Sequence, residues 1–370
     1  MSLLKGNPSL NPAFFIRKAK DTYFAQHDVL PLTSPKAVRV EIKATGLCGS
    51  DLHYYQDGRN GPKVVSAPMV LGHESAGVVV EVGPAVTSVK VGDKVAVEPC
   101  VPSRFSDETM SGNYHLCPHM EFAASPPTHG TLARYFTVDD NFVVKLPDHV
   151  SLEEGATAEP LAVACHANKL AGTTFNRTVF VFGAGPVGLL VAATAKAFGA
   201  TRVLVIDLFD DKLQLAKKMG ATDVHNSRAD RGKSESEVVE GLTSKYFAPD
   251  IVFDATGVKP CIRSGMLAVK PGGTYVQVGM GMNNTEIPLG PLGRKEATVK
   301  GSFRYSFGDY RDAVQLLSSG KVNSKLIITH RFKFKQAKEA YEFAGTGKAV
   351  KIIIEGPTDE DLLLANQSKL

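Results

Sequence analysis

A glycine-rich segment, Val181 to Gly188, constrains the fold of this chain more than any other feature. It reads Val-Phe-Gly-Ala-Gly-Pro-Val-Gly, overlaps the end of the apolar run Thr178 to Phe182, and opens a helical pattern that ends at Gly199. A G-x-G-x-x-G pattern placed between a strand and a helix is the fingerprint of a dinucleotide-binding turn. The segment therefore predicts a parallel, doubly wound sheet whose first turn binds a pyrophosphate.

Each glycine of this turn has a physical reason to be there. Gly183 permits the tight turn, Gly185 lets the backbone approach the pyrophosphate, and Gly188 lets helix and strand pack closely. Pro186 and Val187 begin the helix, whose free N–H groups face the phosphates. We expect all five residues to contact the cofactor, although an ordinary strand-to-helix turn would also use glycine.

Asp207 indicates which dinucleotide is bound. It ends a second apolar strand, residues 202–206, about 20 residues after the last glycine of the fingerprint. A carboxylate there accepts hydrogen bonds from the adenosine ribose and repels a 2′-phosphate. Asp210 and Asp211 add negative charge, and Lys212 is the only base in this stretch. The expected cofactor is NAD, bound in part by Asp207 and Lys212.

The chain is long enough for two domains, because 370 residues exceed one ordinary core. Strands alternate with helices of about ten residues from about residue 160 to residue 301, which indicates an α/β doubly wound sheet. Residues 33 to about 160 instead show short β-runs separated by turn residues. We expect a β-rich catalytic domain at 1–161 and 302–370 around a nucleotide-binding domain at 162–301.

Composition and charge exclude several classes of protein. The net charge is +4, with basic and acidic residues interspersed, which does not favour nucleic acid as a partner. No apolar stretch reaches 18 residues, and the N-terminus lacks a secretion signal, so no membrane partner is expected. Five cysteines, an odd count, argue against a disulfide framework and favour a reducing compartment such as the cytoplasm.

The last three residues, Ser368-Lys369-Leu370, match a peroxisomal import address. They follow a polar, acidic tail, where a receptor could reach them. Coincidence and a cloning remnant are the alternative explanations. The chain is therefore expected in the cytoplasm, with peroxisomal import as the second expectation.

Candidate metal ligands stand in three separate stretches. Cys48 lies in Gly-Leu-Cys-Gly-Ser-Asp, His73 and Glu74 lie in Gly-His-Glu, and Glu159 lies in Ala-Glu-Pro. Sulfur, imidazole and carboxylate together suit zinc. Adjacent residues of a strand point to opposite faces, so His73 and Glu74 can bind one ion only if the backbone turns there or if one of them acts indirectly. A buried polar cluster without metal is the alternative.

These strings together resemble the zinc-containing medium-chain dehydrogenase/reductase family, in its polyol branch of sorbitol and xylitol dehydrogenases, and most of all the xylitol dehydrogenases of yeasts. The resemblance runs from about residue 38 to residue 354, and its motifs occur in the family's order. It implies a GroES-like β-rich catalytic domain and a Rossmann domain. The strings that carry it are 46–53, 72–77, 158–161 and 183–188.

The resemblance also implies a ligand set. Cys48, His73 and Glu74 would hold one catalytic zinc, and Glu159 would contact the ion or its water. Whether Glu74, Glu159 or water completes the zinc shell stays open at this point.

No structural zinc is expected. Many family members bind a second zinc with four cysteines spaced C-x2-C-x2-C-x7-C, and hydroxyls are poor substitutes for thiolates. An improvised site using Cys100, His115 and His119 is the weaker alternative. In this chain, the four cysteine positions of the C-x2-C-x2-C-x7-C pattern are occupied by Ser103, Ser106, Thr109 and Cys117.

The resemblance assigns further roles around the reaction. Ser50 and His53 match a proton relay, for which water held by Glu159 is the competing route. Tyr54, Arg304 and Tyr305, together with Glu159, match substrate-contacting positions, and an arginine fork suits vicinal hydroxyls. Positions that match contacts of the nicotinamide are Val278, Gly279, Met280, Ser302 and Phe303.

The expected activity is the interconversion of xylitol and D-xylulose with NAD, so the expected partner is a small polyol or ketose. Sorbitol or L-arabinitol is the alternative substrate. The alternatives from other classes are a zinc-free quinone reductase, which the Cys48, His73 and Glu74 set opposes, and a non-catalytic NAD-binding protein. By resemblance, the chain is expected to form a homotetramer, with a dimer as the alternative.

Overall fold

A computed structural model describes residues 10–29, 31–281 and 284–362. Ser368-Lys369-Leu370 lies outside the described residues, so its role stays a prediction. Contacts between residues divide the chain into two compact units. The first unit comprises residues 1–159 and 328–370, and the second comprises residues 160–327.

The second unit extends further along the chain than the range 162–301 expected from the sequence. Residues 302–327 belong to it because helix α10 (Asp309–Ser318) is tied to helix α4 (Ala158–Ala171). Asp309 lies 2.8 Å from His166 Nδ1 and 2.7 Å from Lys169 Nζ. The change of sequence pattern near Lys300 therefore marks the end of the parallel sheet of the second unit, and not the end of that unit.

The first unit is rich in short strands, as its turn-rich sequence predicts. A seven-stranded sheet has the order β12-β8-β7-β3-β20-β19, with β11 also paired to β3, and a three-stranded sheet has the order β2-β1-β6. The strands are β1 (Pro12–Lys18), β2 (Asp21–Gln26), β3 (Ala37–Gly46), β4 (Arg59–Asn60), β5 (Lys63–Val64), β6 (Met69–Val70), β7 (Glu74–Val82), β8 (Lys94–Val97), β9 (Cys100–Val101), β10 (Glu121–Phe122), β11 (Tyr135–Asp139), β12 (Val143–Lys145), β19 (Ile328–Phe332) and β20 (Lys351–Glu355).

Few helices accompany these strands. Helix α3 begins with a capping box, in which Ser151 and Glu154 satisfy each other's backbone N–H groups. The helices are α1 (Gly49–Asp57), α2 (Asp107–Met110), α3 (Leu152–Ala156) and α11 (Ala337–Ala344).

Strand β3 organises the larger sheet. Its alternating residues Val38, Val40 and Ile42 are buried in an apolar core with side chains of β7, β8 and β11. The carboxyl end of β3 pairs with both β7 and β20, because Gly46 is opposite Glu74 on one side and Ile353 on the other. Three segments that are far apart in the sequence therefore meet at the end of β3.

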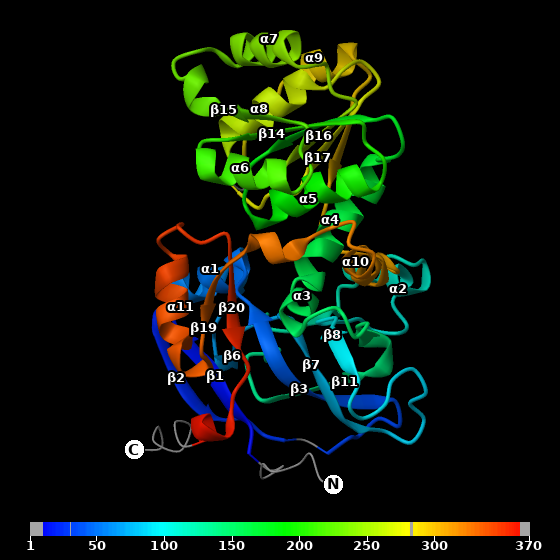
Figure 1. Cartoon of the computed structure of the whole chain (residues 1–370), viewed down its shortest axis with the longest axis vertical. Helices are drawn as coiled ribbons and strands as arrows, with labels where there is room; N and C mark the ends of the chain where they lie inside the picture. The colour runs from blue at the N-terminus through cyan, green and yellow to red at the C-terminus, as the bar shows by residue number, and fades with distance from the viewer. Residues whose placement is uncertain (1–9, 30, 282–283, 363–370) are drawn as a thin grey trace. The chain divides into compact units, whose positions relative to one another are not determined.

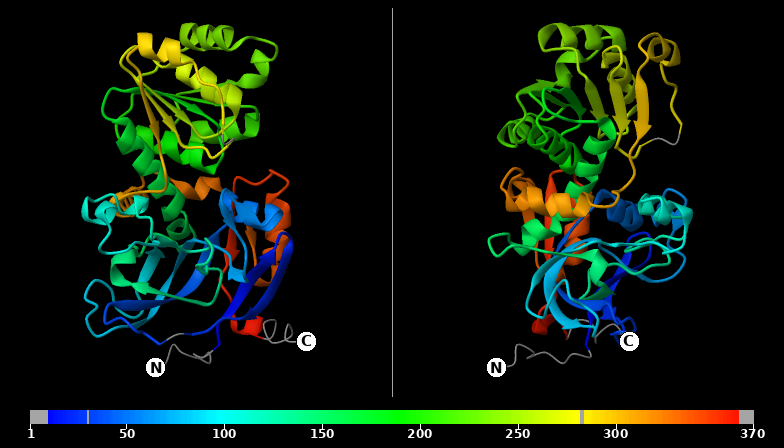
Figure 2. Two further views of the ribbon diagram at one scale, coloured as in Figure 1. Left: turned by 180° about the vertical axis from the view of Figure 1, so that it is seen from behind. Right: turned by 90° about the vertical axis from the view of Figure 1, so that its right-hand side faces the viewer.

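The second unit is a parallel sheet of order β15-β14-β13-β16-β17-β18. Figures 1 and 2 show helices on both of its faces. This confirms the expected doubly wound fold. Its elements are β13 (Thr178–Phe182), α5 (Pro186–Ala197), β14 (Arg202–Asp207), α6 (Asp210–Lys218), β15 (Asp223–Asn226), α7 (Glu235–Lys245), β16 (Ile251–Asp254), α8 (Lys259–Ala268), β17 (Thr274–Gln277), α9 (Leu289–Arg294), β18 (Thr298–Gly301) and α10.

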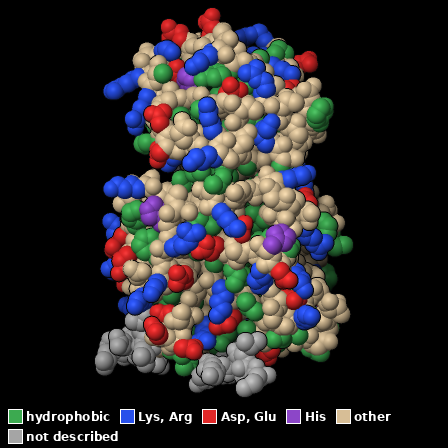
Figure 3. Space-filling view, viewed as in Figure 1, with side chains coloured by type: hydrophobic (Ala, Val, Ile, Leu, Met, Phe, Trp, Pro, Cys, Tyr) green, Lys and Arg blue, Asp and Glu red, His purple; other side chains and the backbone are tan. Residues whose placement is uncertain are grey.

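The surface agrees with the small net charge. Basic and acidic side chains are interspersed on the visible face of each unit (Figure 3). No helix within the described ranges is both long and apolar enough to cross a membrane.

Candidate metal and dinucleotide sites

The candidate metal ligands come together at the end of strand β3. Because Gly46 pairs with Glu74, Cys48 lies just beyond β3 and close to the start of β7. The backbone turns at Gly72, whose φ of +87° favours glycine, so His73 precedes β7 and Glu74 begins it. One ligand atom from each of Cys48, His73 and Glu74 lies within 4.8 Å of the others. The turn lets adjacent residues face the same point, which an unbroken strand would prevent.

These donors fit a zinc ion. His73 and Glu74 are buried, and Cys48 is half-buried. A thiol, an imidazole and a carboxylate at this separation can all reach an ion at the roughly 2.0–2.3 Å distances typical of zinc. Within the described part of the chain, this is the one such group of His, Cys, Asp and Glu side chains.

Asp51 orients the histidine. Its Oδ2 lies 3.2 Å from His73 Nδ1, and its Oδ1 accepts from the Gly72 N–H at 3.4 Å. Burial opposes a charged imidazole, but the Asp51 carboxylate and the Cys48 sulfur outweigh burial and hold the pKa of His73 well above its usual value. A carboxylate on one ring nitrogen fixes the tautomer and leaves the other nitrogen for a metal. Asp51 was not among the residues predicted from the sequence, although an acid three residues after Cys48 was a signal for it.

Lys351 binds the glutamate from strand β20. Its Nζ donates to both carboxylate oxygens of Glu74 and to the Leu47 carbonyl at 3.1 Å. Burial alone would lower the pKa of Lys351, but Glu74 and Cys48 outweigh it and raise that pKa. A side chain at Gly46 would collide with the Glu74 carboxylate, so glycine is needed there. No sequence motif marked Lys351.

Glu159 lies outside the group of three ligands. It is buried in the first turn of α4, and its charge helps to raise the pKa of Lys351. The Glu159 carboxylate therefore lies near the candidate ligands Cys48, His73 and Glu74, but it is not one of that group.

The candidates for proton transfer and substrate binding on α1 differ in exposure. Ser50 is half-buried, while His53 is exposed and its Nδ1 lies 3.3 Å from Asp57 on the same helix. Tyr54 is buried, with its hydroxyl 3.5 Å from Ser125 Oγ. Of these three candidates, Ser50 and His53 are therefore more accessible than Tyr54.

Arg304 and Tyr305 have different surroundings. Arg304 has a φ of +54°, and its guanidinium lies 4.7 Å from the centre of the Phe303 ring. Tyr305 is completely buried, and its ring centre lies 5.6 Å from that of Tyr310. The expected substrate contact of Tyr305 stays a prediction, and its ring packs inside the unit.

The lobe that matches the family's structural-zinc positions has Cys117 within a set of hydrogen bonds. Cys117 is buried among the Ser106 and Thr109 hydroxyls and backbone groups of Ser103 and His119. Burial disfavours a thiolate, but these hydrogen bonds outweigh burial and lower the pKa of Cys117. Three of the positions that match the family's cysteines thus lie around the sulfur of the fourth, Cys117.

The glycine-rich turn has the expected geometry. Gly183 has a φ of +99°, and a side chain at Gly188 would collide with the Gly183 carbonyl. A side chain at Gly185, by contrast, would meet nothing within 4 Å, which leaves open space beside the start of α5. Pro186 occupies the first turn of that helix, followed by Val187.

Asp207 ties the second strand to this turn. Its Oδ2 accepts from the Ala184 N–H at 2.7 Å, and its Oδ1 accepts from the Phe209 N–H at 3.0 Å. Lys212 Nζ lies 5.0 Å and the Arg228 guanidinium 5.2 Å from the centre of the Phe209 ring. From the sequence, Lys212 was the one basic side chain expected beside Asp207. Arg228 was not predicted there, because it follows the next strand, β15.

The remaining cofactor candidates gather at the carboxyl ends of β17 and β18. Val278 and Gly279 each donate a backbone N–H to the Asp254 carbonyl at 2.8 Å. The Ser302 N–H donates to the Gln277 carbonyl at 2.9 Å, which joins the two strand ends. Met280 and Phe303 follow these strand ends and are exposed.

Comparisons with known proteins agree with this architecture. Residues 34–148 match the alcohol dehydrogenase GroES-like domain, and residues 186–319 match the zinc-binding dehydrogenase family. The solved structure of L-idonate 5-dehydrogenase from Escherichia coli aligns with a TM-score of 0.85 and 30% identity, covering 93% of this chain and 98% of that one.

Two yeast relatives match almost the whole chain. Sorbitol dehydrogenase 2 of Saccharomyces cerevisiae is 53% identical over 352 residues, covering 94% of this chain and 98% of that one. D-xylulose reductase of Scheffersomyces stipitis is 49% identical over 363 residues, covering 94% and 99%. The resemblance seen in the motifs is thereby confirmed. This chain belongs to the polyol dehydrogenase branch of the zinc-containing medium-chain dehydrogenase/reductase family.

Proposed function

We propose that this protein oxidises a polyol to the corresponding ketose with NAD and one zinc ion per chain, and that xylitol, which gives D-xylulose, is the leading substrate. The observation that carries the proposal is the grouping of Cys48, His73 and Glu74 within 4.8 Å. The similarity to D-xylulose reductases supports the choice of substrate.

Cys48, His73 and Glu74 would hold the zinc, with Glu159 beside them. Bound zinc would supply a Lewis acid that eases loss of the substrate's hydroxyl proton, and bound NAD would accept a hydride. Asp51 Oδ2 lies 3.2 Å from His73 Nδ1 and would orient the ring so that its other nitrogen can bind a metal. Lys351 fixes the Glu74 carboxylate, so both side chains are positioned before a metal arrives.

The hydroxyl proton needs a path to solvent. Ser50 is the proposed first acceptor, because it is half-buried near the start of α1. His53, one turn further along the helix and exposed, would pass the proton to water. A water held by the Glu159 carboxylate is the competing path.

Arg304 is the proposed substrate-binding residue of the second unit, because its planar fork of donors suits adjacent hydroxyls. Tyr54 is a further proposed substrate-binding residue, through its hydroxyl. Tyr305 would act indirectly, since its packing on Tyr310 fixes the backbone next to Arg304.

NAD would bind along the carboxyl edge of the parallel sheet. The turn at Gly183, Gly185 and Gly188 would receive the pyrophosphate, and Asp207 would receive the adenosine ribose. The proposed contacts with the nicotinamide half come from Val278, Gly279, Met280, Ser302 and Phe303.

Sorbitol is the second candidate substrate, favoured by the higher identity to sorbitol dehydrogenases. Steady-state kinetics with xylitol, sorbitol, L-arabinitol and ethanol, each with NAD and with NADP, test the proposal. We expect the highest kcat/KM with xylitol and NAD. Faster turnover of sorbitol would select the second candidate, and rapid ethanol turnover with slow polyol turnover would contradict both.

Metal removal tests the alternative that this chain is a non-catalytic NAD-binding protein. Chelation should abolish turnover, and added zinc should restore it. NAD binding without any polyol turnover by the zinc-loaded protein would instead favour the non-catalytic alternative.

We propose that the chain forms a homo-oligomer, with a tetramer expected and a dimer as the alternative. Support comes from strand β18, which lies at the edge of the parallel sheet and exposes all four of its residues. An exposed strand edge is a template for pairing with a second copy. Cytoplasmic residence is proposed from the odd number of cysteines. Peroxisomal import is proposed as the alternative from Ser368-Lys369-Leu370, and removal of this tripeptide from a fluorescent fusion tests it.

A further inference from the structure

Thr131 contacts both ends of the turn that carries His73 and Glu74. Its backbone N–H donates to the Gly72 carbonyl at 2.7 Å, on one side of the two candidate ligands. Its hydroxyl Oγ1 lies 2.6 Å from Ser75 Oγ, on the other side of them. A single residue, far from the turn in the sequence, therefore closes the turn from both sides.

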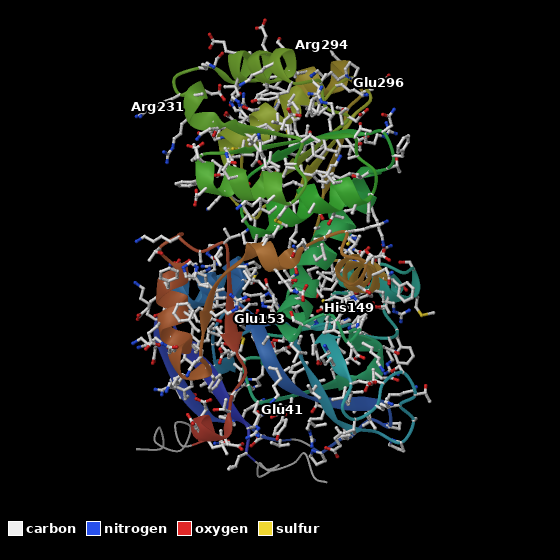
Figure 4. The ribbon with its side chains drawn as sticks, viewed as in Figure 1. Glu41, His149, Glu153, Arg231, Arg294 and Glu296 are labelled. Carbon is white, nitrogen blue, oxygen red and sulfur yellow. The ribbon has the colours of Figure 1, made fainter. Side chains whose placement is uncertain are left out.

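The Ser75 hydroxyl is the middle member of a row of three hydroxyl groups, those of Thr45, Ser75 and Thr131. Ser75 Oγ also lies 2.8 Å from Thr45 Oγ1, because Thr45 is opposite Ser75 in the pairing of β3 with β7. Strand β3 runs from the half-buried Glu41, labelled in Figure 4, into this end, where all three hydroxyl side chains are buried. A hydroxyl can donate one hydrogen bond and accept others, so Ser75 can serve both threonines at once. A hydrogen bond lost at this buried place is not replaced by solvent.

The segment on either side of Thr131 is fixed against the residues that precede the turn. The N–H groups of Gly130 and Leu132 donate to the carbonyls of Val70 and Leu71, at 2.7 and 2.8 Å. A side chain at Gly130 would collide with the Leu71 carbonyl, so glycine is needed for this close approach. Thr131 therefore acts on the turn from a backbone that is itself held in place.

We propose that Thr131 is a positioning residue of the zinc site, and that its hydroxyl holds the turn so that His73 and Glu74 face the same point before a metal binds. The proposal rests on the zinc site of the proposed function. Asp51 and Lys351 contact the ligand side chains, whereas Thr131 acts on the backbone that carries them. Removal of a group that orients metal ligands typically weakens metal binding roughly 10- to 100-fold. Without the Thr131 hydroxyl, part of the turn would have to be ordered when zinc binds, and that ordering costs affinity.

The zinc affinity of the full-length protein tests this proposal without relying on turnover. Competition with a chelator of known zinc affinity measures the dissociation constant of zinc for each variant. Thr131→Val removes the hydroxyl and keeps the shape and the backbone N–H of the residue, while Thr131→Ser keeps the hydroxyl. Ser75→Ala removes the same hydrogen bond from its other side, should the valine variant fail to fold.

We expect Thr131→Val and Ser75→Ala to weaken zinc binding about tenfold, the effect of one buried hydrogen bond. Thr131→Ser should bind zinc nearly as tightly as the unmodified protein. The matched control is Thr178→Val, which removes a hydroxyl bonded to Asp250 at 2.7 Å in the second unit. This control should lower the free energy of unfolding and leave the zinc affinity unchanged. The reason is that a loss felt equally by the metal-free and the zinc-bound protein does not alter binding.

Two outcomes would overturn the proposal. One is an unchanged zinc affinity in a folded Thr131→Val or Ser75→Ala variant, which would make the hydroxyl a contact for stability alone. The other is equal weakening of zinc binding by Thr131→Val and Thr131→Ser. Failure of the unmodified protein to bind zinc would remove the proposed function as well. Normal zinc binding by the unmodified protein therefore separates failure of this proposal from failure of the proposed function.

Discussion

Lys351 Nζ lies 2.7 Å from Oε1 and 2.6 Å from Oε2 of Glu74, and both side chains are buried. The proposed third metal ligand therefore has a positively charged partner of its own. A carboxylate offers about four lone-pair positions, and the lysine uses two of them. Glu74 can thus bind a metal ion and Lys351 at the same time.

Replacing Lys351 by methionine should destabilise the metal-free protein. The change leaves a buried carboxylate without its partner, which costs about 3–5 kcal/mol. Zinc should recover part of this loss, because it supplies positive charge at the same carboxylate. Chemical denaturation with and without zinc measures both effects. The matched control is Lys348→Met, an exposed lysine three residues earlier. Equal stability of the Lys351 and Lys348 variants would contradict the prediction.

Replacing Arg304 by alanine should raise the KM for polyol by about tenfold and change the KM for NAD much less. The reason is the loss of charge-assisted hydrogen bonds to the substrate's hydroxyls. Arg304→Lys should recover little, because an ammonium cannot donate as a planar fork. The control is Arg311→Ala on the following helix, whose guanidinium lies near Phe307. Equal changes of both KM values in the Arg304 variant would argue against a substrate contact.

The lobe around Cys117 should accept a second zinc after three substitutions. Ser103→Cys, Ser106→Cys and Thr109→Cys would complete four thiols at positions that already surround one sulfur. Metal analysis should give one zinc per chain for the natural sequence and two for the triple variant. The same triple variant carrying Cys117→Ser should lose most of the added zinc. Two zinc ions in the natural protein would show that the predicted absence of a structural zinc is wrong.

The edge of the parallel sheet should control assembly. Val299→Lys places a charge in the middle of β18, where paired strands from two copies would bring like charges together. Light scattering coupled to size-exclusion chromatography should show a smaller species than for the unmodified protein. Val258→Lys is the control, because that valine is similarly exposed but lies at the start of α8. An unchanged mass for the Val299 variant would place the interface elsewhere.

Asp309 should stabilise the second unit in a pH-dependent way. Burial favours its neutral form, but His166 and Lys169 outweigh burial and lower the pKa of Asp309 below the ordinary 3.8. A carboxylate with a lowered folded pKa stabilises the fold above its unfolded pKa, and this contribution is lost as the pH falls through the folded pKa. Asp309→Asn should therefore cost about 3 kcal/mol at pH 7.

That cost should shrink as the pH falls below 3.8. Urea unfolding of both proteins from pH 7 to pH 3 measures the difference in the free energy of unfolding. Asp312→Asn, which affects only the exposed part of the same ion-pair network, should cost much less. A constant difference across this pH range would show that the charge of Asp309 is not the cause.

Local patterns predicted the parts of this molecule whose chemistry lies within one short segment. The turn at Gly183 to Gly188 was predicted in this way, because its glycines have a specific spacing. The set Cys48, His73 and Glu74 spans two separate stretches and was instead predicted from the resemblance to the family. Partners supplied by a distant strand could not be found. Lys351 and Arg228 owe their positions to strand register, which a single sequence does not reveal.

The contacts extend the second unit beyond the boundary expected from the sequence, for a similar reason. The periodicity of residues 302–327 resembles neither domain clearly, and their place follows from the contacts of Asp309 with His166 and Lys169. Tyr305 was assigned to the substrate from its position beside Arg304. Its ring packs on Tyr310, a contact that the sequence does not reveal.

The pairing of Lys351 with Glu74 also bears on the order of events during synthesis. The two residues are separated by 277 positions, so a ribosome completes the cysteine, the histidine and the glutamate long before the lysine. A growing chain holds a carboxylate whose charge is not yet balanced, beside a thiol and an imidazole. Metal captured at that time would meet an unfinished site, and the final coordination can be set only when the last strand enters the sheet.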